Sequence, residues 1–383
     1  MVDEKINNEN QETDNVSSFG YATFFSTITK GFFLGIGTYM MFEISKVDTY
    51  ISVIIGALTS IITIAILYFI KRHSESKDII DLNKSLFGNV IGTILNIILC
   101  IALLVLIILI LQNITQFVKI LYMPDTQINY IRILFLIPIA YAANKSIGII
   151  GRISQIVFFV NFVMLFISLI GLIPKINMDN LLPVLKDGVN PTLRSGFIYF
   201  ILYSFPLLLL TIIPNYKIKS SKHSKLKVVI IFLYVTFVMF TRIIMSILVL
   251  GQEVIDVYRF PEYMVLKMST LFEIIERMED TLAMQYHSDV LMFCIFAMYF
   301  IMTFIRKKIK NQKAIKTIPY VISIFIFIVL NILFKESMVA YEFTEKYIIS
   351  IIIVGIFAPM IITLIGTIAR ALKTKMLNLK SAI

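Results

Sequence analysis

Residues 30–41 read KGFFLGIGTYMM, and this stretch interrupts the first of several long apolar segments. Gly31, Gly35 and Gly37 fall within about one and a half helical turns of one another. A helix that crosses a bilayer satisfies its own backbone, so an interruption at membrane depth marks a cavity or a buried site. The stretch therefore predicts a membrane protein whose first helix is discontinuous.

The composition of the chain agrees with a membrane location. Of the 383 residues, 58% are hydrophobic and only 15% are charged, whereas soluble domains average about 25% charged residues. A mean hydropathy of +0.87 excludes a soluble globular domain, a disordered chain and a collagen-like chain. Cys100 and Cys294 both lie in apolar runs, which argues against a disulfide framework or a zinc site. We therefore expect no metal and no cofactor.

Ten stretches are apolar enough to be membrane spans, although the fourth is shorter than the usual length of about 20 residues. We expect an all-α membrane domain over residues 19–371, preceded by a disordered cytoplasmic tail (1–18) and followed by a second cytoplasmic tail (372–383). The connections between the spans are too short for a separate soluble domain. The ten spans are predicted at 21–44, 49–70, 88–122, 131–144, 150–173, 197–216, 228–250, 271–305, 317–334 and 347–369.

The distribution of Lys and Arg predicts the orientation. With the amino terminus in the cytoplasm, roughly 22 of the 35 Lys and Arg residues fall on the cytoplasmic side and about 8 on the other side. Both termini are therefore expected in the cytoplasm. The net charge of +11 is expected to face anionic membrane lipids rather than nucleic acid, because no basic stripe with interleaved aromatic residues occurs.

A second helix breaker lies five spans after the first, where Pro206 removes a backbone donor from SFPLLLL (204–210). Two discontinuous helices in corresponding positions of two five-helix halves are typical of transporters with inverted repeats, in which they build a site at the membrane midplane. Half-helix amino termini suit a carboxylate, and unwound carbonyls suit an ammonium group. The pattern favours a small zwitterion such as an amino acid. In the alternative interpretation, the glycines only allow close helix packing.

Ionisable residues within spans indicate function by default, because each costs at least a few kcal/mol in lipid. Lys30 is interpreted as snorkelling towards the cytoplasm. The acidic face at the start of the eighth span either stands in water or lines a vestibule or a subunit contact. No zinc-protease motif, phosphate loop or serine elbow occurs, so no catalytic residue and no enzyme activity are expected. The charged candidates are Lys30, Glu43, Arg242, Glu273, Glu276, Arg277, Glu279, Asp280 and Asp289.

Five stretches follow one another in a characteristic order: LGIGTYM (34–40), KVDTYISVIIGAL (46–58), LLPVLKDGVNPTLRSGF (181–197), SFP (204–206) and YRFPEYMVLKMSTLFEIIERMED (258–280). The last carries a Glu-Arg-x-Glu pattern at Glu276, Arg277 and Glu279. In this order they resemble the spore germination permease family, the B subunit of endospore germinant receptors, within the amino acid–polyamine–organocation superfamily. The chain departs from the family after SFP, where many members have a glycine and an acidic residue and this chain has three leucines.

The resemblance implies a germinant-sensing subunit of the spore inner membrane that acts with an A subunit and a C subunit and performs no chemical step. The expected ligand is a nutrient, an amino acid in the first place. A proton-coupled secondary amino acid transporter is the alternative function, and a scaffold without ligand is a third. We expect ligand contacts from Gly35, Ile36, Gly37, Tyr203, Ser204, Phe205 and Leu207, structural roles for Gly31 and Pro206, and coupling or subunit contacts from Glu276, Arg277 and Glu279.

Overall fold

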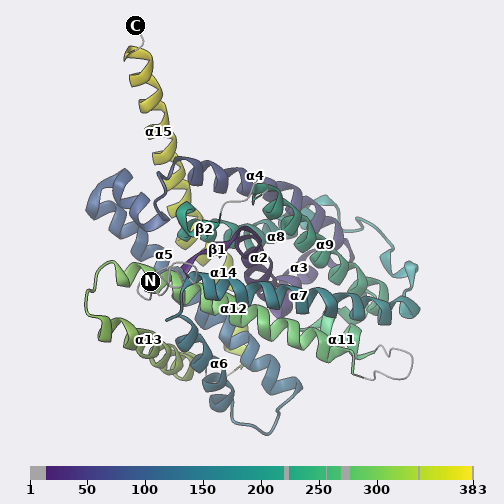
Figure 1. Ribbon diagram of the computed structural model, residues 1–383. Coiled ribbons are helices and arrows are strands. Elements are labelled where there is room, and N and C mark those ends of the chain that lie inside the picture. Colours follow the sequence, from purple (N-terminus) through teal and green to yellow (C-terminus); the bar gives the residue numbers. More distant parts are fainter. Residues whose placement is uncertain (1–13, 220–223, 256, 269–276, 335–336, 382–383) are drawn as a thin grey trace.

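A computed structural model describes the chain except for residues 1–13, 220–223, 256, 269–276, 335–336 and 382–383 (Figure 1). The described residues are almost entirely helical. In the first part of the chain the helices are α2 (Ser18–Thr29), α3 (Thr38–Ser45), α4 (Thr49–His73), α5 (Ile79–Leu121), α6 (Ile128–Ala142) and α7 (Ile147–Leu172). The later helices are α8 (Val189–Leu209), α9 (Ser224–Leu250), α10 (Gln252–Ile255), α11 (Pro261–Lys267), α12 (Glu279–Arg306), α13 (Gln312–Leu333), α14 (Ser337–Ile352) and α15 (Ala358–Ser381).

Short polar residues begin several of these helices. Ser17 accepts a hydrogen bond from the backbone of α2, and Asp78 does the same for α5. Ser146 and Asn311 cap α7 and α13 in the same way. Such side chains satisfy backbone N–H groups that have no partner within the helix, and so the polar connections of the sequence determine where the apolar helices start.

Eight stretches of the described chain are helical, long and apolar enough to cross a membrane. The first, Ser18–His73, contains two of the expected spans, and α6 has only 15 residues. Large apolar side chains such as Leu58, Val90 and Leu134 are more than 60% exposed, which is what a lipid-facing surface requires. The chain is thus a helical integral membrane protein, while the count of ten spans stays a prediction.

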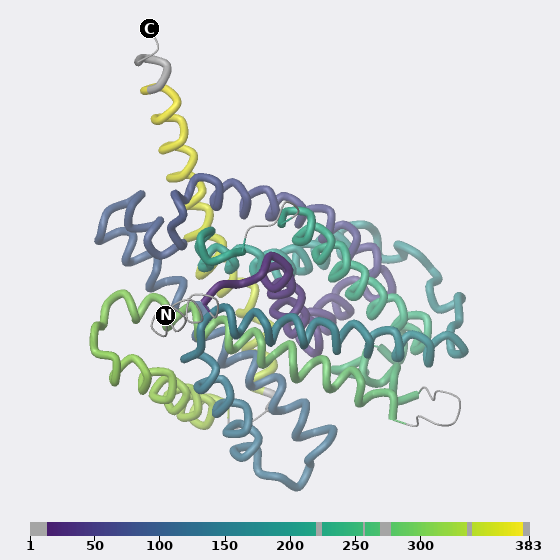
Figure 2. Tube along the Cα trace, in the orientation of Figure 1, coloured from purple at the N-terminus to yellow at the C-terminus, as the bar shows by residue number. Residues whose placement is uncertain are grey.

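The first helix lies inside the bundle. Every residue of α2 except Phe19 is buried, and α2 packs against α7, α8, α9 and α12. Figure 2 shows this purple segment surrounded by teal and green ones. Just before it, β1 (Val16–Ser17) pairs in parallel with β2 (Ile218–Lys219). The last residues of the expected 1–18 tail are therefore held against the helices, with Val16 only 1% exposed.

The sixth span is not broken at Pro206, where the sequence placed its breaker. Helix α8 continues through Pro206 to Leu209, passes into a 3-10 turn (Leu210–Ile212) and becomes extended at Ile213. A proline within a membrane helix is tolerated where neighbouring helices surround it, and Pro206 is buried among them. The predicted start of the eighth span at residue 271 lies outside the described residues; α12 is described from Glu279.

Candidate functional site

The first helix is interrupted where the sequence places its glycines. After α2 the chain forms a 3-10 turn (Lys30–Phe32) and a wide turn (Phe33–Gly37) before α3 begins at Thr38. Within the wide turn, Leu34 has a ψ of 119° and Gly35 a φ of 71°, both non-helical. A positive φ is accessible to glycine without steric cost, so Gly35 determines where the helix breaks.

Asn113 of α5 holds the open carbonyl of this break. Its side-chain Nδ2 donates to the carbonyl oxygen of Leu34 at 2.9 Å and to the hydroxyl of Tyr286 on α12 at 2.5 Å. Asn113 and Tyr286 are each only 2% exposed. The Oδ1 atom of Asn113 has no hydrogen-bond partner among the described residues. One buried acceptor therefore remains available beside the break.

An aromatic cluster closes the break. A Cβ atom placed on Gly35 would lie 2.1 Å from Cε1 of Phe260, just before α11, so the ring of Phe260 rests directly on the glycine. Phe117 contacts the rings of Phe260, Tyr263 and Tyr286 edge-on, with centroid distances of 5.0, 5.5 and 5.2 Å. The space next to the broken backbone is therefore apolar and aromatic.

A buried ion pair lies one turn before the break. Lys30 Nζ is 3.2 Å from Asp289 Oδ2 of α12, and both side chains are 1% exposed. Asn161 of α7 donates to the other oxygen of Asp289 at 2.8 Å. The interpretation of Lys30 as a snorkelling residue is wrong, because its ammonium group finds a carboxylate inside the bundle. Arg242 of α9 also attracts Asp289 electrostatically, so the carboxylate compensates Lys30 by direct contact and Arg242 at longer range.

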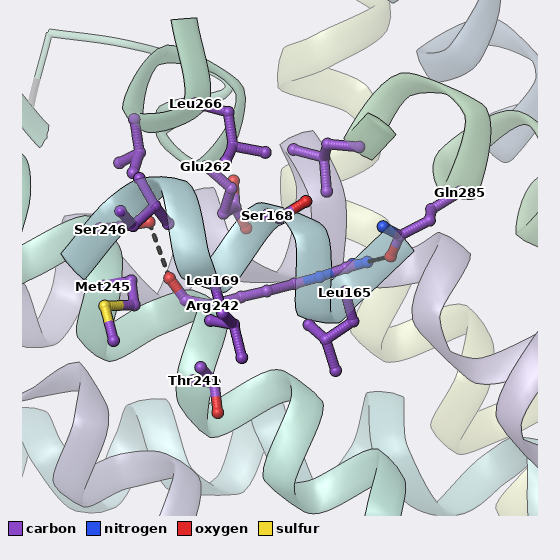
Figure 3. A pocket seen from close by; sticks show the side chains of 13 residues that line it. Leu165, Ser168, Leu169, Thr241, Arg242, Met245, Ser246, Glu262, Leu266 and Gln285 are labelled. Atoms are coloured by element: carbon purple, nitrogen blue, oxygen red, sulfur yellow. Dashed lines mark hydrogen bonds between the residues drawn. The ribbon is translucent and has the colours of Figure 1, made fainter. Parts of the chain in front are cut away.

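A small cavity of about 30 Å³ lies among α7, α9, α11 and α12 (Figure 3). Arg242 crosses it and donates to Gln285 at 2.5 Å. Glu262 also lines it, is only 5% exposed, and has one oxygen without a hydrogen-bond partner among the described residues. Burial raises the pKa of Glu262. The cavity has room for one or two water molecules, and it holds a cation and an acidic group on opposite walls.

The residues expected to contact the ligand are all buried, but only some surround the break. Gly35, Ile36 and Gly37 form it, and the ring of Phe205 contacts Phe32 edge-on at 4.9 Å. The remaining candidates, Tyr203, Ser204 and Leu207, lie in the interior of α8.

The hydroxyl groups of Tyr203 and Ser204 are already occupied by neighbouring helices. The hydroxyl of Tyr203 donates to the carbonyl oxygen of Phe232 at 2.6 Å, and Ser204 donates to Ser60 at 3.0 Å. These two side chains therefore bind α9 and α4. Gly31 packs closely on α12, since an added Cβ would lie 3.3 Å from Val290. Contact of the candidate residues with a ligand stays a prediction.

The expected acidic face of the eighth span is only partly described. Glu273 and Glu276 lie outside the described residues. Arg277 is within 3.8 Å of Glu279 and 3.2 Å of Asp280, and its side chain is 66% exposed. Asp280 also accepts a hydrogen bond from Tyr122 at 2.8 Å. Arg277 is thus exposed while Glu279 is buried, and a role in coupling or subunit contact stays a prediction.

Three functional candidates were not predicted from the sequence: Asn113, Phe260 and Glu262. A signal for Asn113 existed, because LQNITQ (111–116) places polar residues within the most hydrophobic span. Phe260 and Glu262 follow a connecting segment, and nothing in their local pattern shows that they fold back onto the first helix. Asp289 was a candidate, but its pairing with Lys30 depends on tertiary structure.

A buried break in a central helix, with a polar side chain bound to its open carbonyl, is typical of the helical membrane proteins that build binding sites from discontinuous helices, as secondary transporters do. The model of the spore germination protein family matches residues 22–340, a range that contains the break, Asn113 and Asp289. The chain therefore belongs to the spore germination protein family, and the resemblance seen in its sequence is confirmed. A search of curated proteins finds no match.

Proposed function

We propose that this chain is the germinant-sensing subunit of a receptor in the spore inner membrane, and that it binds a nutrient amino acid at the broken first helix. Membership in the spore germination protein family supports a membrane protein that takes part in germination. The observation that carries the ligand site is Asn113 Oδ1, which lies beside the Leu34 carbonyl and has no hydrogen-bond partner among the described residues.

The chemistry of the break suits such a ligand. A buried acceptor without a partner costs about 1–3 kcal/mol, and an ammonium group donating to Asn113 Oδ1 removes this cost. Phe117, Phe260 and Tyr263 offer an apolar wall for an aliphatic or aromatic side chain. Since Phe260 rests on Gly35, ligand entry displaces this ring. The ligand then favours the displaced conformation and shifts the population of the receptor towards it.

In this proposal the chain transmits the shift to the A and C subunits and carries out no chemical step. Its termini lie in the cytoplasm, as the excess of Lys and Arg on that side predicts. Because no chemical step is involved, we expect a substitution at a ligand contact to change which nutrient the receptor senses.

A proton-coupled amino acid transporter is the second candidate, and Asp289 is the observation that favours it. This carboxylate lies at membrane depth, one turn from the break, where protonatable residues of transporters are found. Uptake of labelled amino acids into vesicles with an imposed pH gradient distinguishes the two functions. A transporter accumulates the amino acid, whereas a sensor binds the amino acid without accumulating it.

Spores that carry Gly37→Ala test the proposed site. The new methyl group would lie 2.8 Å from the end of the flexible Leu202 side chain, beside the break. Gly366→Ala is the control, because its methyl group would lie 2.5 Å from the ring of Phe87 in α5, away from the break. We expect Gly37→Ala to change the response to one nutrient at normal abundance in the membrane. Equal responses of both variants and the wild type to every nutrient would contradict the proposal.

A further inference from the structure

A second, larger cavity lies at the membrane face where α4 ends. Its volume is about 840 Å³, and it is bounded by α2, α4, the start of α9, and Asn215 and Ile218, which follow α8. Four of its lining residues are basic and none is acidic. The lining residues are Tyr21, Ala65, Tyr68, Phe69, Lys71, Arg72, His73, Asn215, Ile218, Ser224 and Lys225.

The wall of this cavity changes from apolar to cationic along a single helix. Ala65, Phe69 and Arg72 follow one another on one face of α4. They cover about 10 Å along the helix axis, with Tyr68 between the first and the last. A phospholipid shows the same order of polarity, from its acyl chain through the glycerol region to its phosphate. The cavity is thus graded in the direction in which a lipid stands in the membrane.

The cations at the mouth are available for a ligand. Arg72 and Lys225 are both exposed, and neither forms an ion pair with an acidic residue among those described. Lys225 Nζ lies 5.7 Å from the ring centroid of Tyr68, over its face. Behind them Lys71 is held in place, because its ammonium group donates to the carbonyl of Ile213 at 2.9 Å and to Tyr21 at 3.3 Å.

A neighbouring groove extends the positive charge. Arg72 and His73 also line a cavity of about 590 Å³ against α15, which adds Arg370 and Lys375. Glu75 in this groove lies 2.8 Å from Lys77 and 3.6 Å from Arg370. Basic pockets between membrane helices on the cytoplasmic side are typical of headgroup binding. A soluble anion would use the cations but would make no use of the apolar wall at Ala65 and Phe69.

We propose that the cavity at the end of α4 binds an anionic phospholipid, with its phosphate at Arg72 and Lys225 and its acyl chain along Ala65 and Phe69. The lipid fills the space between α4 and α9 and so joins two helices that pack around the broken first helix.

The test uses the full-length protein in nanodiscs of phosphatidylcholine into which phosphatidylglycerol is titrated, with retained phosphatidylglycerol counted by native mass spectrometry. The variant is Arg72→Gln/Lys225→Gln. The control is Lys313→Gln/Lys316→Gln, which removes two exposed charges from the start of α13. These lysines lie on the same side of the protein as the end of α4, because Lys307 Nζ, at the end of α12, is 2.6 Å from Asp81 Oδ2, just after α4. We expect binding about 30-fold weaker in the variant, because two direct contacts with the phosphate are lost, and little change in the control, whose lysines do not line the cavity.

Three results would overturn the proposal. In the first, the variant binds phosphatidylglycerol as tightly as the wild type does. In the second, the control loses as much affinity as the variant, which assigns the effect to general surface charge. In the third, inorganic phosphate displaces the lipid at equal concentration, which assigns the site to soluble anions. A second variant, Ala65→Trp, fills the apolar wall and leaves the cations in place. We expect it to weaken lipid binding without a change in the weak binding of inorganic phosphate, and equal binding of the lipid would also contradict the assignment.

Discussion

Removal of one partner of the Lys30–Asp289 pair is expected to destabilise the protein strongly. The Nζ and Oδ2 atoms are 3.2 Å apart, and each side chain is 1% exposed. In Lys30→Met the carboxylate keeps the hydrogen bond from Asn161 at 2.8 Å and the electrostatic attraction of Arg242, but it loses the cation in direct contact with it. Breaking a buried pair from one side costs about 3–5 kcal/mol where the remaining charge has no other partner, so the attraction of Arg242 places the expected cost at the lower end of this range.

The double variant Lys30→Met/Asp289→Asn is expected to regain much of this stability. Replacement of both charges leaves neutral groups, and buried ion pairs contribute little net stability compared with neutral packing. Asn161 can still donate to the amide oxygen at position 289. Independent sites add to within about 0.5 kcal/mol in a double-mutant cycle. The coupling energy between positions 30 and 289 is expected to be several times this value.

The assay is thermal denaturation of the purified full-length protein in detergent, followed by the loss of monodisperse protein on size exclusion. Lys30→Met and Asp289→Asn should each lower the apparent melting temperature, and the double variant should lie above both. A control at the exposed pair Lys46–Asp187, 3.0 Å apart with side chains 42% and 50% exposed, should change little in either single variant. Single variants as stable as the wild type, or a double variant that shows the summed loss, would refute the reasoning.

Three further predictions concern the break and its surroundings. Gly35→Ala should reduce the amount of folded protein in the membrane far more than Gly88→Ala does. Both glycines have a positive φ, so both variants carry a backbone strain of about 1 kcal/mol. Only the methyl group at Gly35 meets Phe260, so the difference in membrane abundance measures this contact. Asn113→Leu should cost about 1–3 kcal/mol in denaturation experiments and abolish the nutrient response; normal germination would count against a role of the amide. Burial raises the pKa of Glu262, so at moderate pH the folded protein keeps a proton that the unfolded chain has lost. The stability of the folded protein should therefore fall as the pH rises from about 4 through the raised pKa. In a pH series of melting curves, Glu262→Gln should remove this fall.

The sequence predicted the first break well, because the conformational requirement there is local. Three glycines in one and a half turns mark a place where an apolar helix can break, and the positive φ of Gly35 explains why. The same reasoning failed at Pro206. Proline removes one donor, but whether the helix breaks depends on the surrounding helices, and α8 is buried along this stretch.

The partners of the break could not be predicted from local patterns. Asn113 reaches Leu34 across 79 positions of the chain, and Asp289 comes from α12 to meet Lys30 of the first helix. These pairs depend on which helices are neighbours, and a hydropathy pattern contains no such information. Charge inside a span did indicate importance, since a buried lysine requires a counter-ion, but it did not identify which carboxylate supplies it.

Equilibrium binding of labelled amino acids to the purified full-length protein tests the central claim most directly. The chain in nanodiscs is offered a panel of aliphatic, aromatic and charged amino acids, and bound ligand is measured for the wild type and for Asn113→Leu. We predict saturable binding of an aliphatic or aromatic amino acid that the wild type shows and Asn113→Leu loses. Equal binding by both proteins would place the ligand away from the broken helix and contradict the account.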